Sequence, residues 1–193
     1  MRDSYPPLDA WLAELGLEVV DRRDDAPGLA TSRDIVLDGE RRFDLRVTLA
    51  WVADVGLSMW AYYGQEAMEI PKRVFLRMLH AHFEYPLVKF AMTDDDRPML
   101  MTELPPRAVT LDEVGRGLAR IAIVADRLLE ETSLAIRDRG ELPDWTARRS
   151  RNPELLARYR RDVEAAMPAW EPPPTRKRRS RDAAGSAPGG EPS

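Results

Sequence analysis

Cysteine is missing altogether from this chain of 193 residues. Its absence excludes disulfides, thiolate nucleophiles and cysteine-ligated zinc or iron–sulfur sites. Chains without cysteine are also typical of reducing compartments, so we expect a cytoplasmic protein.

Long apolar runs and a secretion signal are missing as well. The N-terminal segment MRDSYPPLDAWLAELG carries acidic residues and paired prolines where a signal peptide needs a basic start and an unbroken apolar run. The apolar stretch 121–125 is bounded by Arg120 and Asp126 and is far shorter than the roughly 20 residues of a membrane-spanning helix. The sequence therefore predicts neither export nor membrane contact.

Most of the chain lacks an excess of positive charge. Residues 1–136 carry 16 basic and 24 acidic side chains, whereas residues 137–193 carry 13 and 9. An acidic body repels nucleic acid, so phosphate contacts are expected only from the basic run Arg176, Lys177, Arg178, Arg179 and Arg181. This run has no aromatic residues for base stacking, which favours a solvated tail over a nucleic-acid contact.

The sequence contains no combination of residues typical of a catalytic or metal site. His80 and His82 are two residues apart, so on a helix they point to different sides. The acidic run 94–96 lacks the glycine and glutamate of a calcium loop and predicts a charged turn. Glu66 and Glu69 precede a helix, where carboxylates usually compensate the helix dipole. We therefore predict a protein that is not an enzyme and needs no cofactor or metal.

Four segments show helical periodicity, at residues 8–15, 71–84, 110 onward and 153–166. In the second, an apolar stripe is expected to face the core, formed by Val74, Phe75, Met78, Leu79, His82 and Phe83. The third opens with Thr110 and Glu113 in a capping box. Its Gly115 and Gly117 predict close packing in preference to phosphate binding. The fourth is Arg-rich and is expected to dock on the body or on another molecule.

Strand patterns occur at residues 17–21, 33–37, 43–51, 57–63, 87–93 and 99–104. Segment 43–51 alternates without error, which predicts one buried and one solvated face. Asp38-Gly39 before it indicates a tight hairpin turn. Both faces of segment 57–63 are partly apolar, so its register stays open.

These elements predict an α+β fold, an antiparallel sheet of about five strands with helices packed on it. We expect one domain over residues 1–140, then an Arg-rich linker with a short helix over 141–167. Residues 168–193 are basic and rich in proline, with too little to bury to offset the entropy of ordering, and predict a disordered tail.

Apolar side chains that accept varied partner shapes are plentiful in the predicted strands. Methionine adapts to different surfaces, and aromatic residues supply large contact areas. Candidate peptide-binding residues are Trp60, Tyr62, Met92, Met99 and Met101. Core filling is the alternative for any single methionine.

The order of elements resembles that of a known family. The segments VFLRMLHAHFEYPLVKFAMTDDDRPMLMTELP and TLDEVGRGLARIAIVADRLLEE, within residues 8–136, look like the YbjN-type domain, whose fold is shared with type III secretion chaperones. The resemblance implies a non-catalytic, chaperone-like or regulatory domain that holds an extended polypeptide, often as a homodimer.

Two functions therefore stand side by side. We favour a cytoplasmic module that binds a peptide or protein, and the alternative is a nucleic-acid-associated protein that contacts phosphates through its basic tail. The identity of the client and the oligomeric state stay open at this point.

Overall fold

A computed structural model describes six segments of the chain, with the side chains of 73 and 74 excepted: residues 5–24, 31–52, 54–62, 72–94, 97–129 and 147–167. The expected domain boundary at 140 and the expected disordered tail lie outside these residues.

Six strands form one antiparallel sheet in the order β1-β2-β3-β4-β6-β5. Their bounds are β1 Val19–Asp24, β2 Thr31–Leu37, β3 Leu45–Val52, β4 Gly56–Tyr62, β5 Lys89–Met92 and β6 Pro98–Leu104. The predicted α+β class with an antiparallel sheet is confirmed, with six strands in place of about five.

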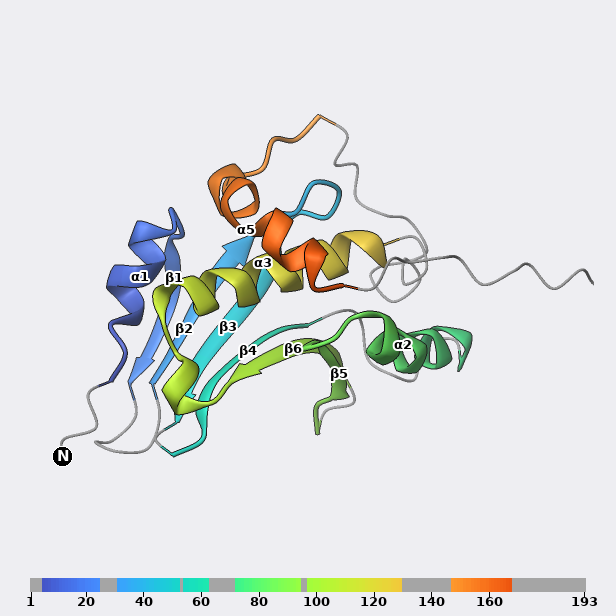
Figure 1. Cartoon of the computed structure of the whole chain (residues 1–193), viewed down its shortest axis with the longest axis horizontal. Coiled ribbons are helices and arrows are strands. Elements are labelled where there is room, and N and C mark those ends of the chain that lie inside the picture. The colour runs from blue at the N-terminus through green and yellow to red at the C-terminus, as the bar shows by residue number, and fades with distance from the viewer. Residues whose placement is uncertain are drawn as a thin grey trace, which may run out of the picture.

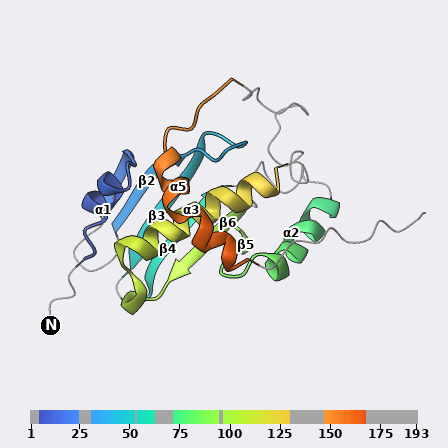
Figure 2. The ribbon, with the colours of Figure 1, turned by 45° about the horizontal axis from the view of Figure 1, so that its top comes forward.

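Helices cover one side of this sheet (Figures 1 and 2). Their bounds are α1 Leu8–Glu14, α2 Lys72–Glu84, the 3-10 turn η2 Pro106–Ala108, α3 Leu111–Arg127 and α5 Pro153–Ala165. Helix α3 runs across β4 and β6, and α5 packs on α3. Helix α2 lies beside the sheet, next to β5 (Figure 1).

The alternation predicted for the third strand is confirmed, because Leu45, Val47 and Leu49 are buried beneath the helices. The neighbouring strand β4 buries Leu57, Met59 and Ala61 on the same side. This settles the register that the sequence left open, and it turns Trp60 and Tyr62 to the opposite face of the sheet.

The connection between β2 and β3 differs from the predicted tight hairpin. A loop of residues 38–44 joins the strands, and Asp38 at its start is fully buried. The Asp38 carboxylate accepts a hydrogen bond from the Asp44 backbone N–H at 2.9 Å, and Asp44 has the left-handed φ of 57°. The Asp-Gly pair does not form a two-residue turn here, because the Asp38 side chain hydrogen-bonds to the backbone inside the longer loop.

Close packing at two glycines of α3 is confirmed. A Cβ atom on Gly115 would lie 2.3 Å from Cε2 of Tyr159 on α5, and one on Gly117 would lie 2.3 Å from the terminal methyl of Met59 on β4. The helix start is also as predicted, since Thr110 Oγ1 accepts from the Glu113 N–H at 3.3 Å. These contacts fix α3 between the sheet and α5.

The expectation that one stripe of α2 faces the core is wrong in part. Met78 is buried and Phe75 packs against the core, but Leu79 is 58% exposed and Phe83 is 88% exposed. His82 is exposed too, and Val74 is one of the two side chains left undescribed. Because α2 lies at the side of the sheet, only a narrow strip of the helix is covered, through Met78 and Ala81.

Candidate protein-interaction surfaces

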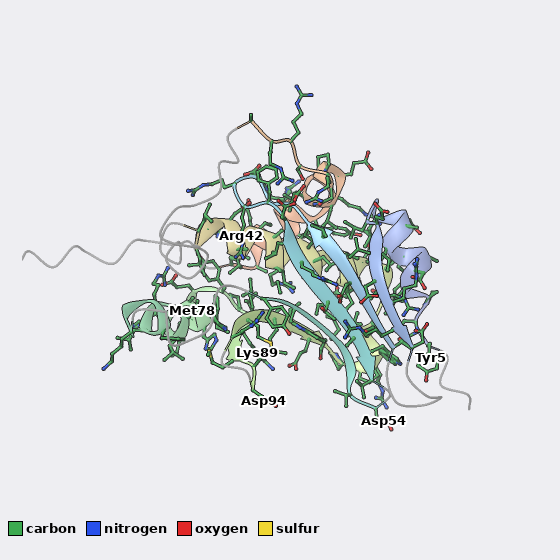
Figure 3. The ribbon with its side chains drawn as sticks, turned by 180° about the vertical axis from the view of Figure 1, so that it is seen from behind. Tyr5, Arg42, Asp54, Met78, Lys89 and Asp94 are labelled. Atoms are coloured by element: carbon green, nitrogen blue, oxygen red, sulfur yellow. The ribbon has the colours of Figure 1, made fainter. Side chains whose placement is uncertain are left out.

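Four of the five predicted peptide-binding residues meet on the face of the sheet opposite α3. Trp60 pairs with Met101 across β4 and β6, and Tyr62 pairs with Met99 two residues further along. All four side chains are at least partly exposed, and we call them the sheet patch. Figure 3 shows the molecule from this side, with Lys89 of the edge strand labelled beside β6.

Charged residues border the sheet patch on both sides. On the β3 side, Arg46 forms an ion pair with Asp34 at 2.7 Å. On the β5 side, Lys89 forms an ion pair with Glu103, and Lys89 lies opposite Met101. An apolar centre with a polar rim is the composition typical of protein interfaces.

The fifth predicted residue does not join this group. Met92 follows Ala91, which lies opposite Met99, so the alternation of β5 directs Met92 to the other face of the sheet. Met92 is nevertheless 43% exposed at the end of this edge strand.

A second apolar surface runs along the outer side of α2, and two of its residues, Leu79 and Phe83, were expected to face the core. Its members recur at helical spacing and are all exposed: Leu76, Leu79, Phe83 and Leu87. We call them the α2 stripe. Leu76, Leu79 and Phe83 are three to four apart, so they form one ridge on the side of the helix away from Met78. Leu87 lies in the turn after the helix ends at Glu84. The signal was present in the sequence, as a second apolar period beside the core-facing one.

Leu87 has an unusual backbone. Its φ is 66°, in the left-handed region that favours glycine, although its side chain is 69% exposed. Its carbonyl accepts a hydrogen bond from Thr102 Oγ1 at 2.8 Å, which holds this turn against β6. Burial of the leucine side chain therefore does not offset the cost of this backbone conformation.

Helix α2 also occupies part of the edge of the sheet. The Phe90 backbone N–H of β5 donates to His82 Nε2 at 2.6 Å, and the two rings are 5.6 Å apart. The backbone amide of Phe90 is therefore not available to an added strand. This arrangement favours side-chain surfaces over strand addition at β5 as the means of binding a partner.

A buried polar cluster fixes the 38–44 loop to the chain that precedes α5. Asp38 and Asn152 exchange two hydrogen bonds, from Asp38 N–H to Oδ1 at 2.9 Å and from Nδ2 to the Asp38 carbonyl at 3.0 Å. Arg151 donates to both Asp38 oxygens at 2.8 Å. Burial by itself raises the pKa of the Asp38 carboxyl, but the hydrogen bonds from Arg151 and from the Asp44 amide outweigh it and hold this pKa below its usual value.

The same loop is held from the other side by Asp126 of α3. The Asp126 carboxylate accepts from the backbone N–H groups of Glu40, Arg41 and Arg42 at 2.6, 3.1 and 2.7 Å. Gly39 lies so close that an added Cβ would be 2.3 Å from the carboxylate. No local pattern predicts this role of Asp126, because its partners are 84 to 86 residues away.

Among the described residues there is no group of three or more histidine and carboxylate side chains that could hold a metal ion. Glu66 and Glu69 lie outside the described residues, as does the basic run from Arg176 to Arg181. In the same part of the chain, no helix has the length and apolar composition needed to cross a membrane. That the protein is not an enzyme stays a prediction.

The chain was compared with known families, curated proteins and solved structures. No family model matches the sequence, and no curated protein does so either. A chain of the solved heterodimeric complex ExoU–SpcU from the type III secretion system of Pseudomonas aeruginosa is similar in structure, with 21% sequence identity and a TM-score of 0.46. The likeness covers 64% of this chain and 95% of that one.

Proposed function

We propose that this protein is a non-catalytic module that binds another polypeptide through its exposed apolar surfaces, in the manner of a chaperone or regulator. The observation that carries this proposal is the α2 stripe, in which three large apolar side chains of the helix and Leu87 of the turn after it face solvent, with Phe83 exposed to 88%. The absence of cysteine supports a reducing, cytoplasmic setting.

The geometry of α2 favours a protein partner. A helix with apolar residues on two sides is normally buried on both. In α2 one side is buried through Met78 and Ala81, whereas the ridge of Leu76, Leu79 and Phe83 is exposed. Scattered exposed leucines need no explanation, but a continuous row of them marks an interaction site. A ridge of this kind fits a groove, or the apolar face of a second helix.

The sheet patch supplies a second anchor. Trp60 and Tyr62 offer large, stiff contact areas, and Met99 and Met101 adapt to the side chains that meet them. Residues of these types are enriched at binding hot spots or at adaptable surfaces. We therefore propose that both surfaces contribute, with the α2 stripe as the main one. A second copy of the chain, giving a homodimer, is one partner that fits the stripe.

A photo-crosslinker tests this proposal directly. We expect p-benzoylphenylalanine in place of Leu79 to capture a discrete polypeptide in cells, and the same group in place of the exposed Arg107 to capture none. The mass of the product separates a homodimer from a complex with another protein. If both positions captured the same mixture of proteins with the same yield, the result would argue against a specific binding site on α2.

Substitutions complete the test. Phe83→Glu is expected to lower the yield of crosslinked product from position 79 by at least about tenfold, because a buried, unpaired carboxylate is costly at an apolar interface. The free energy of unfolding should change by less than about 0.5 kcal/mol, since Phe83 is exposed. By contrast, Met78→Ala should cost about 2–4 kcal/mol because Met78 is in the core. Retained capture by Phe83→Glu would refute the proposal.

A further inference from the structure

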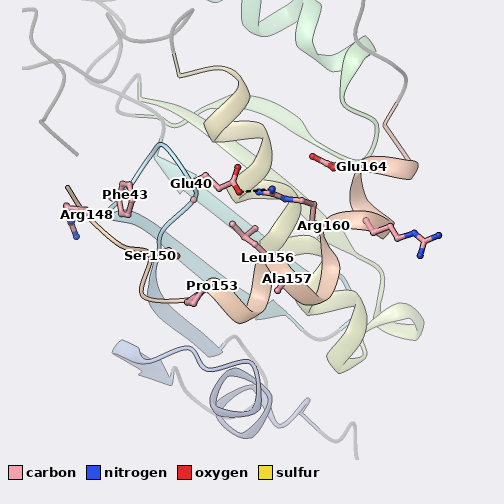
Figure 4. A pocket seen from close by; sticks show the side chains of 11 residues that line it. Glu40, Phe43, Arg148, Ser150, Pro153, Leu156, Ala157, Arg160 and Glu164 are labelled. Atoms are coloured by element: carbon pink, nitrogen blue, oxygen red, sulfur yellow. Dashed lines mark ion pairs between the residues drawn. The ribbon is translucent and has the colours of Figure 1, made fainter. Parts of the chain in front are cut away.

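A hollow of about 670 Å³ lies between the 38–44 loop and α5, away from both apolar surfaces described above. Figure 4 shows it from close by. Its apolar lining residues are Phe43, Pro153, Leu156 and Ala157. Its charged lining residues, which we call the rim, are Glu40, Arg148, Arg160, Arg161 and Glu164. A volume of this size is in the range of small-molecule sites, roughly 300–1,000 Å³.

The walls of the hollow are fixed from behind. Asp126 holds the backbone of the loop on one side through three N–H groups. Asp38 holds the segment before α5 on the other side, through Arg151 and Asn152. Tyr159 fixes α5 itself, because its hydroxyl donates to Asp112 of α3 at 2.8 Å. The hollow is therefore preformed, which lowers the entropy that a ligand would lose on binding.

The charges at the rim leave one positive group uncompensated. Glu40 forms an ion pair with Arg160 at 2.7 Å. Glu164 forms one with Arg127, whose side chain lies outside the hollow, at 3.0 Å. Both rim carboxylates are thus neutralised. Arg161 makes no ion pair within the described part of the chain.

Arg148 adds a second cation at the far side of the hollow. Its guanidinium lies 5.2 Å from the centre of the Phe43 ring and forms an ion pair with Asp44. The hydrogen bond to Asp44 raises the pKa of Arg148, so this group stays charged. A ligand that enters the hollow thus meets apolar carbon below and guanidinium groups at the rim. Guanidinium groups bind carboxylates by charge-assisted hydrogen bonds.

We infer that this hollow binds a small organic anion, with an apolar body that covers Phe43 and Leu156 and a single carboxylate that pairs with Arg161. This site is independent of the proposed polypeptide binding, because it shares no residue with the α2 stripe or the sheet patch.

Octanoate is a suitable probe, with octan-1-ol and acetate as controls that keep only the apolar body or only the charge. In a ¹H–¹⁵N NMR titration of the full chain, octanoate should give saturable shifts of the amides at residues 39–43 and 156–161. Its Kd is expected to be lower than that of either control by about tenfold, the effect of one charge-assisted pair. Octan-1-ol binding as tightly as octanoate, or shifts centred on residues 76–87, would overturn the inference.

Three variants sharpen the test. Arg161→Ala should raise the Kd for octanoate by about tenfold, whereas Arg149→Ala, which removes an exposed arginine that does not line the hollow, should leave it unchanged. Ala157→Trp should fill the hollow and abolish the shifts, while capture by the α2 stripe persists. Equal effects of Arg161→Ala and Arg149→Ala, or no saturation by about 10 mM octanoate, would each refute the site.

Discussion

Gly115 of α3 lies directly against the ring of Tyr159 of α5, so closely that a methyl group at position 115 would be 2.3 Å from Cε2 and 2.8 Å from the hydroxyl oxygen. The ring is also tied by its hydroxyl to Asp112. Burial, together with this hydrogen bond, raises the pKa of Tyr159 to about 12. The close packing of α3 against α5 therefore depends on glycine, the smallest residue, facing the large tyrosine ring.

This contact predicts that alanine lowers the stability of the protein at Gly115 but leaves it nearly unchanged at Gly117 of the same helix. Gly115→Ala should lower the free energy of unfolding by about 1–3 kcal/mol, because the Tyr159 ring must move and lose its bond to Asp112. Gly117→Ala would bring the new Cβ to 2.3 Å from the terminal methyl of Met59, with Met59 Sδ at 3.3 Å and Thr102 Cγ2 at 3.4 Å. The flexible end of Met59 can shift, and a helix-propensity gain of about 1 kcal/mol offsets the cost. Urea denaturation of both variants measures the difference. Equal destabilisation would show that the ring is not a rigid neighbour.

The three backbone amides that converge on Asp126 predict a severe effect of its removal. Asp126→Ala leaves the N–H groups of residues 40–42 without this acceptor, and an unsatisfied group costs about 1–3 kcal/mol where it is buried, as at Arg42, and less where it is part-buried, as at Glu40 and Arg41. We expect a total loss of at least about 3 kcal/mol, measured by thermal or urea unfolding. Asp162→Ala is the control, since its ion pair with Arg116, 3.5 Å long and on the surface, should contribute less than about 1 kcal/mol. Similar losses for the two variants would contradict this role.

The depressed pKa of Asp38 predicts how stability changes with acid. The pKa lies below the unfolded value of about 3.9, so the carboxylate stabilises the fold fully above that pH. The contribution is lost as the pH falls through the folded-state pKa. Asp38→Asn should be less stable than wild type at pH 7, and its stability should fall less steeply below about pH 4. Urea unfolding at pH 7, 4 and 3 measures both effects, and parallel pH curves would exclude Asp38 as a source of acid sensitivity.

The left-handed backbone of Leu87 predicts that stability and binding change in opposite directions. Leu87→Gly removes a conformational cost of about 1–2 kcal/mol, partly cancelled by the greater entropy of glycine in the unfolded chain. We expect the melting temperature to stay the same or to rise. Crosslinking from position 79 should weaken, because the α2 stripe loses one of its four side chains. A lower melting temperature together with unchanged crosslinking would contradict both parts.

The sequence predicted local structure well wherever side-chain periodicity alone decides it. The alternation of segment 43–51 and the capping box at Thr110 both depend on residues within a few positions of each other, and both were confirmed. The α+β class followed from the order of these elements.

The sequence failed where distant partners decide the outcome. Asp38 was interpreted as a turn residue because its role depends on Arg151 and Asn152, more than a hundred residues away. Leu79 and Phe83 on the outer side of α2 were expected to face the core, since a pattern of apolar residues does not show where a helix lies relative to the sheet. The pairing of Trp60 with Met101 likewise depends on a strand order that no local pattern contains.

The seam between α3 and α5 has a practical consequence for anyone who shortens the chain. Leu155, Leu156 and Val163 belong to the same hydrophobic cluster as Leu118 and Ile121, so α5 is a wall of the core and not an appendage. A version that stops before Pro153 lacks α5 and would expose to solvent the face of α3 on which α5 packs. It should precipitate or associate with itself, whereas one that extends through Met167 retains every core residue of α5.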